Sequence, residues 1–84
     1  MTKKIPYGNI KTVQELGQQI RQKRKELKLN QTQLAGYCNV GIRFISDLEN
    51  GKPTIEFQKA IQVLQVLGLE LQIVPRVWQG KIDE

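Results

Sequence analysis

The sequence has no histidine and only one cysteine, Cys38, and these two absences exclude several kinds of chemistry. A single thiol cannot form a disulfide within the chain or a zinc site built from several cysteines. Without histidine, neither a Ser–His–Asp nor a Cys–His catalytic arrangement is available. We therefore expect a protein that is not an enzyme and that needs no metal or other cofactor. Cys38 falls at an apolar helix position, which favours a small buried side chain in a reducing compartment.

Long apolar runs are also missing, because no stretch approaches the roughly 18 residues that a membrane-spanning helix needs. The N-terminus has no hydrophobic signal segment either, so we expect a soluble, cytoplasmic protein. Acidic residues are scarce relative to basic ones, which gives a formal net charge of +5 and a pI of about 9.6. Such a surplus suggests a polyanionic partner or a membrane surface. With 84 residues the chain is one small domain, a size at which oligomerisation often adds stability.

The basic residues are concentrated in the first part of the chain. Residues 1–52 contain ten Lys and Arg against four Asp and Glu, a net charge of +6. Residues 53–84 contain three against four, a net charge of −1. The basic surface is therefore expected on the first part, and the second part must serve another purpose.

Residues 31–51 read as two short helices joined by a tight turn. Asn30 can cap the first helix, with Gln33 placed to complete a capping box. Asn39 stands where the chain must turn sharply, and asparagine tolerates a left-handed backbone. Gly41 can then cap the second helix. This arrangement is typical of a helix-turn-helix unit.

The second helix of this unit has distinct inner and outer faces. If Ile45 and Leu48 point inward, the 3.6-residue period turns a polar set outward. Arginine pairs with guanine, asparagine with adenine, and aliphatic groups contact the thymine methyl, so such a face can read a DNA major groove. The alternative is an ordinary helical hairpin whose outer face is only solvated. The outward set consists of Ile42, Arg43, Ser46, Asp47 and Asn50.

A longer helix is predicted before this unit. Thr12 to Glu15 reads T-V-Q-E, a capping box, and it opens a helix with a 3.6-residue apolar period. Basic residues near its end either contact phosphates or complement the helix dipole. The basic residues 1–11 form an arm that either lies along phosphates or is loosely packed. The apolar positions are Val13, Leu16, Ile20 and Leu27, and the basic band is Arg21, Lys23, Arg24, Lys25 and Lys28.

The remaining chain predicts one more helix and a strand. Thr54 can cap a helix that runs to about Leu67, and its wide apolar face requires cover from the helical hairpin and from a second copy of the chain. From Leu69 to Val74 apolar and polar residues alternate as in a strand. Because a lone strand leaves backbone groups unpaired, we expect pairing with the same segment of another protomer; the alternative is an extended tail across the chain's own helices. Residues 75–84 form a tail with Trp78 as its one large apolar side chain.

The run IRQKRKELKLNQTQLAGYCNVGIRFISDLENGKPT, followed by VLGLELQIV, resembles the Xre-type helix-turn-helix regulators and within them the HipB-like antitoxins. The resemblance covers about residues 12–74. It implies a mostly α, lambda-repressor-like domain of about four to five helices, with one C-terminal strand pairing across a dimer. The resulting division is an arm at 1–11, a DNA-binding domain at 12–68, a dimerisation strand at 69–74 and a tail at 75–84.

The resemblance also implies roles for individual residues. Gln31 contacts phosphate or orients the reading helix. The groove-facing residues are Ile42, Arg43, Ser46 and Asp47, whereas Asn50 and Lys52 face the DNA backbone. Asn39 replaces the more usual turn glycine, and Gly41 replaces a polar cap, which shifts readout toward Arg43. The full DNA-contacting set is Gln31, Gln33, Ile42, Arg43, Ser46, Asp47, Asn50, Lys52, Arg24 and Lys28, and the dimerisation set is Leu69, Leu71, Ile73 and Val74.

The function implied by this resemblance is a transcriptional repressor that binds a palindromic double-stranded DNA operator as a homodimer. Its second role is that of antitoxin to a HipA-like kinase toxin encoded alongside it, with autoregulation of the shared operon. Two alternatives stay open. One is a phage-type repressor or a restriction–modification controller without a kinase partner, and the other is a protein-interaction adaptor that does not bind DNA.

Overall fold

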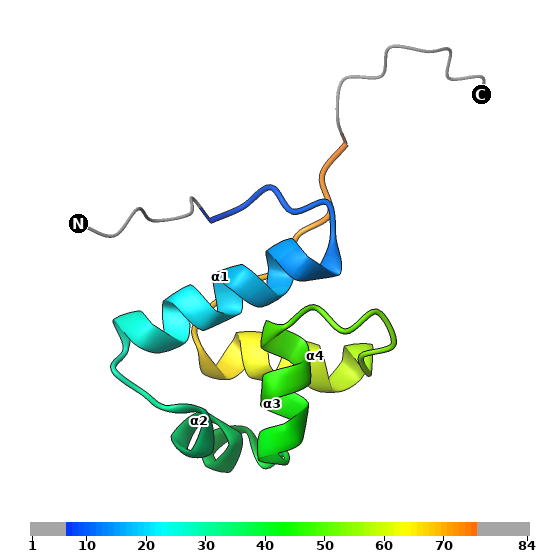
Figure 1. The fold of residues 1–84 in the computed structure, drawn as a ribbon. Coiled ribbons are helices and arrows are strands. Elements are labelled where there is room, and N and C mark those ends of the chain that lie inside the picture. The colour runs from blue at the N-terminus through cyan, green and yellow to red at the C-terminus, as the bar shows by residue number, and fades with distance from the viewer. Residues whose placement is uncertain (1–6, 76–84) are drawn as a thin grey trace.

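The computed structural model describes residues 7–75, and in this range the chain forms a mostly helical domain, as predicted (Figure 1). Each helix is short, so its stability depends on packing against the others rather than on propensity alone. No helix within the described residues is long and apolar enough to cross a membrane. The helices are α1 (Val13–Glu26), α2 (Gln31–Cys38), α3 (Ile42–Glu49) and α4 (Phe57–Val66).

Helix α1 begins at the predicted cap. Thr12 Oγ1 accepts a hydrogen bond from the Glu15 amide at 3.0 Å. The Glu15 carboxylate accepts from the amide of Lys11 rather than from that of Thr12 itself, so the reciprocal half of the capping box is displaced by one residue. At the other end, Leu27 is the C-cap and its side chain is 47% exposed. Its prediction as one of the apolar positions of this helix is wrong, because the helix ends at Glu26 and Lys28 then adopts a left-handed backbone with φ 60°.

The turn chemistry predicted for α2 and α3 is confirmed. The Asn30 side chain accepts from the Gln33 amide at 2.7 Å, and the Gln33 side chain accepts from the Asn30 amide at 2.8 Å. Asn39 ends α2 in the left-handed region with φ 58° and ψ 45°. Gly41 precedes α3 without a side-chain cap. These contacts fix the direction in which α3 leaves the turn.

The core is assembled from all four helices. Burying such aliphatic side chains stabilises the fold by about 1.5–3 kcal/mol each. Ile45 and Leu48 are both fully buried, which confirms the inward face of α3. Cys38 is buried, as predicted, and burial raises the pKa of its thiol. The buried apolar residues are Ile20, Leu34, Ala35, Cys38, Ile45, Leu48, Ala60, Val63, Leu64 and Leu67.

Two glycines allow the backbones of α1 and the end of α3 to touch. A Cβ at Gly17 would lie 2.3 Å from the carbonyl oxygen of Leu48 and 2.6 Å from that of Glu49. A Cβ at Gly51 would lie 2.7 Å from Gln14 Cα, and Gly51 also has φ +74°. Neither position has room for a side chain, so the spacing of the two helices depends on both glycines.

Helix α4 differs from its prediction. It begins at Phe57 with Glu56 as N-cap, three residues after Thr54, because the Ile55 amide bonds to the Lys52 carbonyl at 3.2 Å and keeps this segment in a turn. Its apolar surplus is real, since Phe57 is 56% and Val66 44% exposed.

The predicted C-terminal strand is not found among the described residues. The Leu69 amide bonds to the Leu64 carbonyl at 2.8 Å, and residues 70–75 then continue without regular secondary structure. The physical reason is that a strand needs a neighbouring strand, and the single chain supplies none in residues 7–75. Helix α4 ends at Val66, with Leu67 as its C-cap.

The described part of the N-terminal arm packs along α1 and is not loose. The Tyr7 hydroxyl donates to Glu26 Oε1 at 3.1 Å, and the Gly8 amide donates to Gln19 Oε1 at 3.2 Å. Partial burial raises the pKa of the Tyr7 phenol, so this donor keeps its proton at neutral pH. The predictions that concern residues 1–6 and 76–84, including Trp78, lie outside the described residues.

The contact at Gly17 predicts an unusual response to alanine. Gly17→Ala must displace the α3 backbone, so we expect a loss of about 2–4 kcal/mol in the free energy of unfolding. Gly36 is the matched control, because it lies in α2 with nothing within 4 Å of its Cβ position. Gly36→Ala should gain about 0.5–1 kcal/mol through helix propensity. Urea denaturation of both variants measures this, and equal stability of the two would contradict the close approach.

Candidate nucleic-acid interface

The outer face of α3 is exposed in the way that the sequence predicts. Ile42 is 47% exposed, Arg43 and Asn50 are exposed, and Ser46 and Asp47 are partly exposed. Within residues 7–75, Arg43 forms no ion pair, so its guanidinium is free to bind an outside group. A face with one free cation, two short polar side chains and one aliphatic group can make directional contacts as well as an apolar one.

The single acid on this face is partly offset by a neighbouring cation. Asp47 Oδ2 lies 3.5 Å from Lys52 Nζ, and the Lys52 amide donates to the Asp47 carbonyl at 3.0 Å. Lys52 follows α3 in sequence, and these two contacts bring it back beside the helix. The pair reduces the repulsion that Asp47 would otherwise exert on a phosphate, and it holds Lys52 at the edge of the α3 surface.

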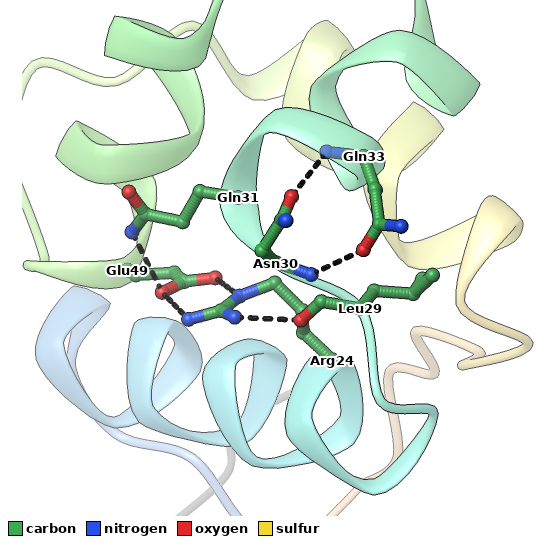
Figure 2. A network of polar contacts seen from close by, with 6 residues as sticks. All are labelled: Arg24, Leu29, Asn30, Gln31, Gln33 and Glu49. Atoms are coloured by element: carbon green, nitrogen blue, oxygen red, sulfur yellow. Dashed lines mark hydrogen bonds and ion pairs between the residues drawn. The ribbon is translucent and has the colours of Figure 1, made fainter.

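Behind this face lies a buried ion pair that joins α1 to α3 (Figure 2). Arg24 Nε donates to Glu49 Oε2 at 2.6 Å, and Arg24 Nη2 donates to Glu49 Oε1 at 3.0 Å. Arg24 Nη1 also donates to the Leu29 carbonyl at 2.8 Å. Both residues are only 7% exposed. The prediction that Arg24 contacts DNA phosphates is wrong, since its guanidinium is enclosed and already committed to a carboxylate.

Gln31 extends the same network to α2. Its Nε2 donates to Glu49 Oε1 at 3.1 Å, and the side chain is half-buried (Figure 2). Glu49 therefore receives donors from the last turn of α1 and the first turn of α2. This contact fixes how the start of α2 sits against the end of α3, which fits the orienting role expected of Gln31. Gln33, by contrast, uses its side-chain oxygen to cap α2.

Glu49 is the structural residue that sequence reasoning missed. Its only signal is position, because it directly follows the inward-facing Leu48 in a helix whose other acid, Asp47, points outward. In a basic chain, such an acid is easily mistaken for an ordinary surface charge. The remaining basic band stays at the surface: Arg21, Lys25 and Lys28 are exposed and Lys23 is partly exposed.

No group of three or more His, Cys, Asp or Glu side chains in residues 7–75 is placed to hold a metal ion. Two hollows lie on the far side of α1, between the arm and the C-terminal segment, and neither includes the α3 surface.

Comparisons with known proteins agree with this geometry. Residues 20–74 match the family model described as helix-turn-helix. The chain is 51% identical over 65 residues to an uncharacterized HTH-type transcriptional regulator, y4mF, of Sinorhizobium fredii (strain NBRC 101917 / NGR234), which covers 77% of this chain and 86% of that protein.

Solved structures share the fold at lower identity. A chain from the "Structure of HipA-HipB-O2-O3 complex" has a TM-score of 0.75 and 20% identity, with 82% of this chain and 97% of that chain covered. A chain from the "HipB-O4 20mer complex" gives the same four values. At this identity the likeness supports the fold.

The buried ion pair predicts strongly non-additive mutations. Glu49→Ala or Arg24→Ala alone leaves a buried charge unpaired, so each should lower the free energy of unfolding by about 3–5 kcal/mol. The double variant Arg24→Met with Glu49→Leu replaces both charges by apolar groups and should lie within about 2 kcal/mol of wild type.

The exposed pair between Lys59 Nζ and Glu56 Oε1, 3.5 Å apart, is the control. Glu56→Ala should cost less than about 1 kcal/mol, since solvent screens that pair. Urea titration gives all four values. A Glu49→Ala loss no larger than that of Glu56→Ala would contradict the role assigned to the buried pair.

Proposed function

Because the chain belongs to the Xre-type helix-turn-helix family of transcriptional regulators, we propose that it binds double-stranded DNA with α3 in the major groove. The observation that carries this proposal is the exposed outer face of α3, held from behind by the buried Arg24–Glu49 pair. Binding in a groove requires that α3 be held rigidly. The hydrogen bonds among Arg24, Glu49 and Gln31, together with the turn at Asn39, hold it in this way. The side chains that contact bases then extend from a backbone with a fixed position.

Within this proposal the α3 residues have different tasks. Arg43 donates to O6 and N7 of a guanine, and Ile42 contacts a thymine methyl. Ser46 can donate or accept at either base. Asp47 accepts from the exocyclic amine of cytosine, and Lys52 offsets its charge while approaching a phosphate.

Residues outside α3 fix the register on the duplex without reading sequence. Gln31 and Gln33 lie in the first turn of α2, where backbone amides and side chains meet a phosphate. Asn50, the C-cap of α3, faces the DNA backbone. Lys28, exposed at the end of α1, adds charge through counterion release.

The proposed active form is a homodimer on a palindromic operator. A second copy would supply the neighbour that residues 69–74 lack, since Leu69, Leu71 and Ile73 alternate with polar residues. Leu71, Ile73 and Val74 are 42%, 96% and 66% exposed, so apolar surface remains to be covered. Two-fold symmetry then separates the two α3 helices by about one DNA turn, roughly 34 Å.

The proposed biological role is that of a repressor and antitoxin. It rests on the likeness to the fold of a chain in a HipA–HipB complex and on the uneven charge, +6 in residues 1–52 and −1 in residues 53–84. The basic part suits DNA, while the second part carries surplus apolar surface for a protein partner, proposed as a HipA-like kinase toxin. Repression of its own operon and neutralisation of the toxin then use different surfaces.

Substitution of Arg43 tests the DNA proposal. A duplex selected by the full chain from a random-sequence library serves as the probe, with a scrambled duplex as competitor. Arg43→Ala should weaken the selected duplex by about 1–3 kcal/mol and relax preference at one base pair per half-site. Lys28→Ala is the control, because it should weaken both duplexes alike and reduce the slope of log K against log salt by about one. Failure of the wild type to prefer any duplex would refute the proposal.

Co-expression with the product of the adjacent gene tests the antitoxin role. We expect that product to arrest growth alone, and growth to recover when this chain is present. The two proteins should also elute together in size-exclusion chromatography at micromolar concentration. A harmless neighbour, or separate elution, would leave a plain repressor or a restriction–modification controller.

A further inference from the structure

The arm and the C-terminal segment form the two walls of an open groove on the outer side of α1. One wall is residues 8–11 and the other is residues 70–74. A smaller hollow of about 80 Å³ continues beneath it, where Gln19, Leu64 and Leu69 form the floor. The groove thus connects both ends of the described chain.

The arm wall is held firmly against α1. Tyr7 bonds to Glu26, Gly8 bonds to Gln19, and Lys11 bonds to Glu15, so three residues spread along α1 anchor it. Gln19 is only 7% exposed, so the Gly8 contact is shielded from solvent. Holding five residues in this way costs conformational entropy, and none of these contacts involves α3. The hydrogen bonds therefore anchor the arm to α1 rather than to the recognition helix.

The opposite wall has unused backbone groups. After the Leu69 amide, no backbone hydrogen bond joins residues 70–75 to any other part of the described chain. Ile73 is 96% exposed and Val74 66% exposed along the same segment. A wall of this kind offers donors, acceptors and apolar side chains together, which an extended peptide segment can satisfy.

We propose that residues 69–74 of a second copy of this chain occupy the groove, so that the arm of each protomer contacts the C-terminal segment of its partner. Across the interface, the arm of one protomer is followed by the partner's residues 69–74, then by residues 69–74 of the first protomer, and then by the partner's arm. Residues 8–11 are then part of the dimer surface and not only a leader to α1. The inference rests on the proposed homodimer and adds the arm to its interface.

A second copy fits this groove for three reasons. The segment is self-complementary in an antiparallel, two-fold arrangement, since its apolar residues alternate with polar ones. Its Glu70 brings a negative charge to a groove whose arm wall carries Lys11. Burying the same segment from both chains also removes two unpaired edges at once, which no single added peptide would do.

Hydrogen exchange of the wild-type chain tests this without any substitution. Sedimentation equilibrium first locates the dimer midpoint, and exchange is then followed well above and well below that concentration. In the dimer, amides of residues 8–11 and 70–74 should both exchange about tenfold more slowly, while those of residues 52–56 should not change.

Three results would overturn the inference: protection of 70–74 alone, protection of the arm at every concentration, or no dimer at all. Arm protection that does not depend on concentration would mean that the chain's own C-terminal end fills the groove. Operator binding is measured separately on the same sample. A chain that binds DNA with an unprotected arm refutes this inference and leaves the proposed function intact.

Substitutions give a second readout. Ile10 is half-buried and lines both hollows, so Ile10→Asp should weaken dimerisation at least about tenfold, as should Ile73→Asp on the other wall. Tyr37→Asp is the matched control, because Tyr37 is 66% exposed on α2, away from the groove. Thermal melts at high concentration establish that each variant folds. Equal dimer affinity for Ile10→Asp and Tyr37→Asp would exclude the arm from the interface.

Discussion

The buried pair of Arg24 and Glu49 is the constraint on which the rest of this small domain depends. Taking two charges out of water is expensive, and the cost is offset only when their geometry and remaining hydrogen bonds are satisfied. Here both carboxylate oxygens accept from Arg24, and the third guanidinium nitrogen donates to the Leu29 carbonyl. The pair can exist in one relative placement of α1 and α3, so it specifies that placement.

Two glycines also fix the relative placement of α1 and α3, because they set how closely the two backbones approach. Gly17 and Gly51 let backbone meet backbone, so α1 and α3 can neither approach further nor separate without breaking the pair. Gln31 then transfers the constraint to α2 through Glu49. Helices of eight residues, such as α2 and α3, have marginal stability by themselves. The exposed face of α3 is therefore held rigid by the packed interior behind it.

Local chemistry explains what the sequence predicts well. Caps at Thr12 and Asn30, the left-handed Asn39 and the inward Ile45 and Leu48 all follow from rules that act over four or five residues, and all are present. Arg24 was misassigned for the opposite reason. Its neighbours Lys23 and Lys25 have the same charge, and the carboxylate that binds Arg24 belongs to a residue 25 positions away.

The segment after α4 shows a second limit of prediction from local sequence. Apolar and polar residues alternate in residues 69–74, but the strand that this pattern predicts needs a partner that residues 7–75 do not contain. The turn at 52–55 likewise delays α4 beyond Thr54, because a backbone hydrogen bond from Ile55 to Lys52 competes with helix initiation. The order of apolar and polar side chains predicts which face of a segment is apolar. Whether that segment becomes a helix, a strand or a turn depends on the hydrogen bonds that its backbone can form.

Helix α1 separates two surfaces of the molecule. At about 100° per residue, Gln19 and Glu26 lie on one side of α1, and Gly17 and Arg24 lie roughly half a turn away on the other. Gln19 and Glu26 anchor the arm, whereas Gly17 and Arg24 contact the end of α3. Figure 1 shows the arm and α3 on opposite sides of α1. A partner bound beside the arm would therefore leave the outer face of α3 uncovered. Protein association and DNA binding need not compete in this fold, and a rigid α1 between them would let one partner bind while the other stays in place.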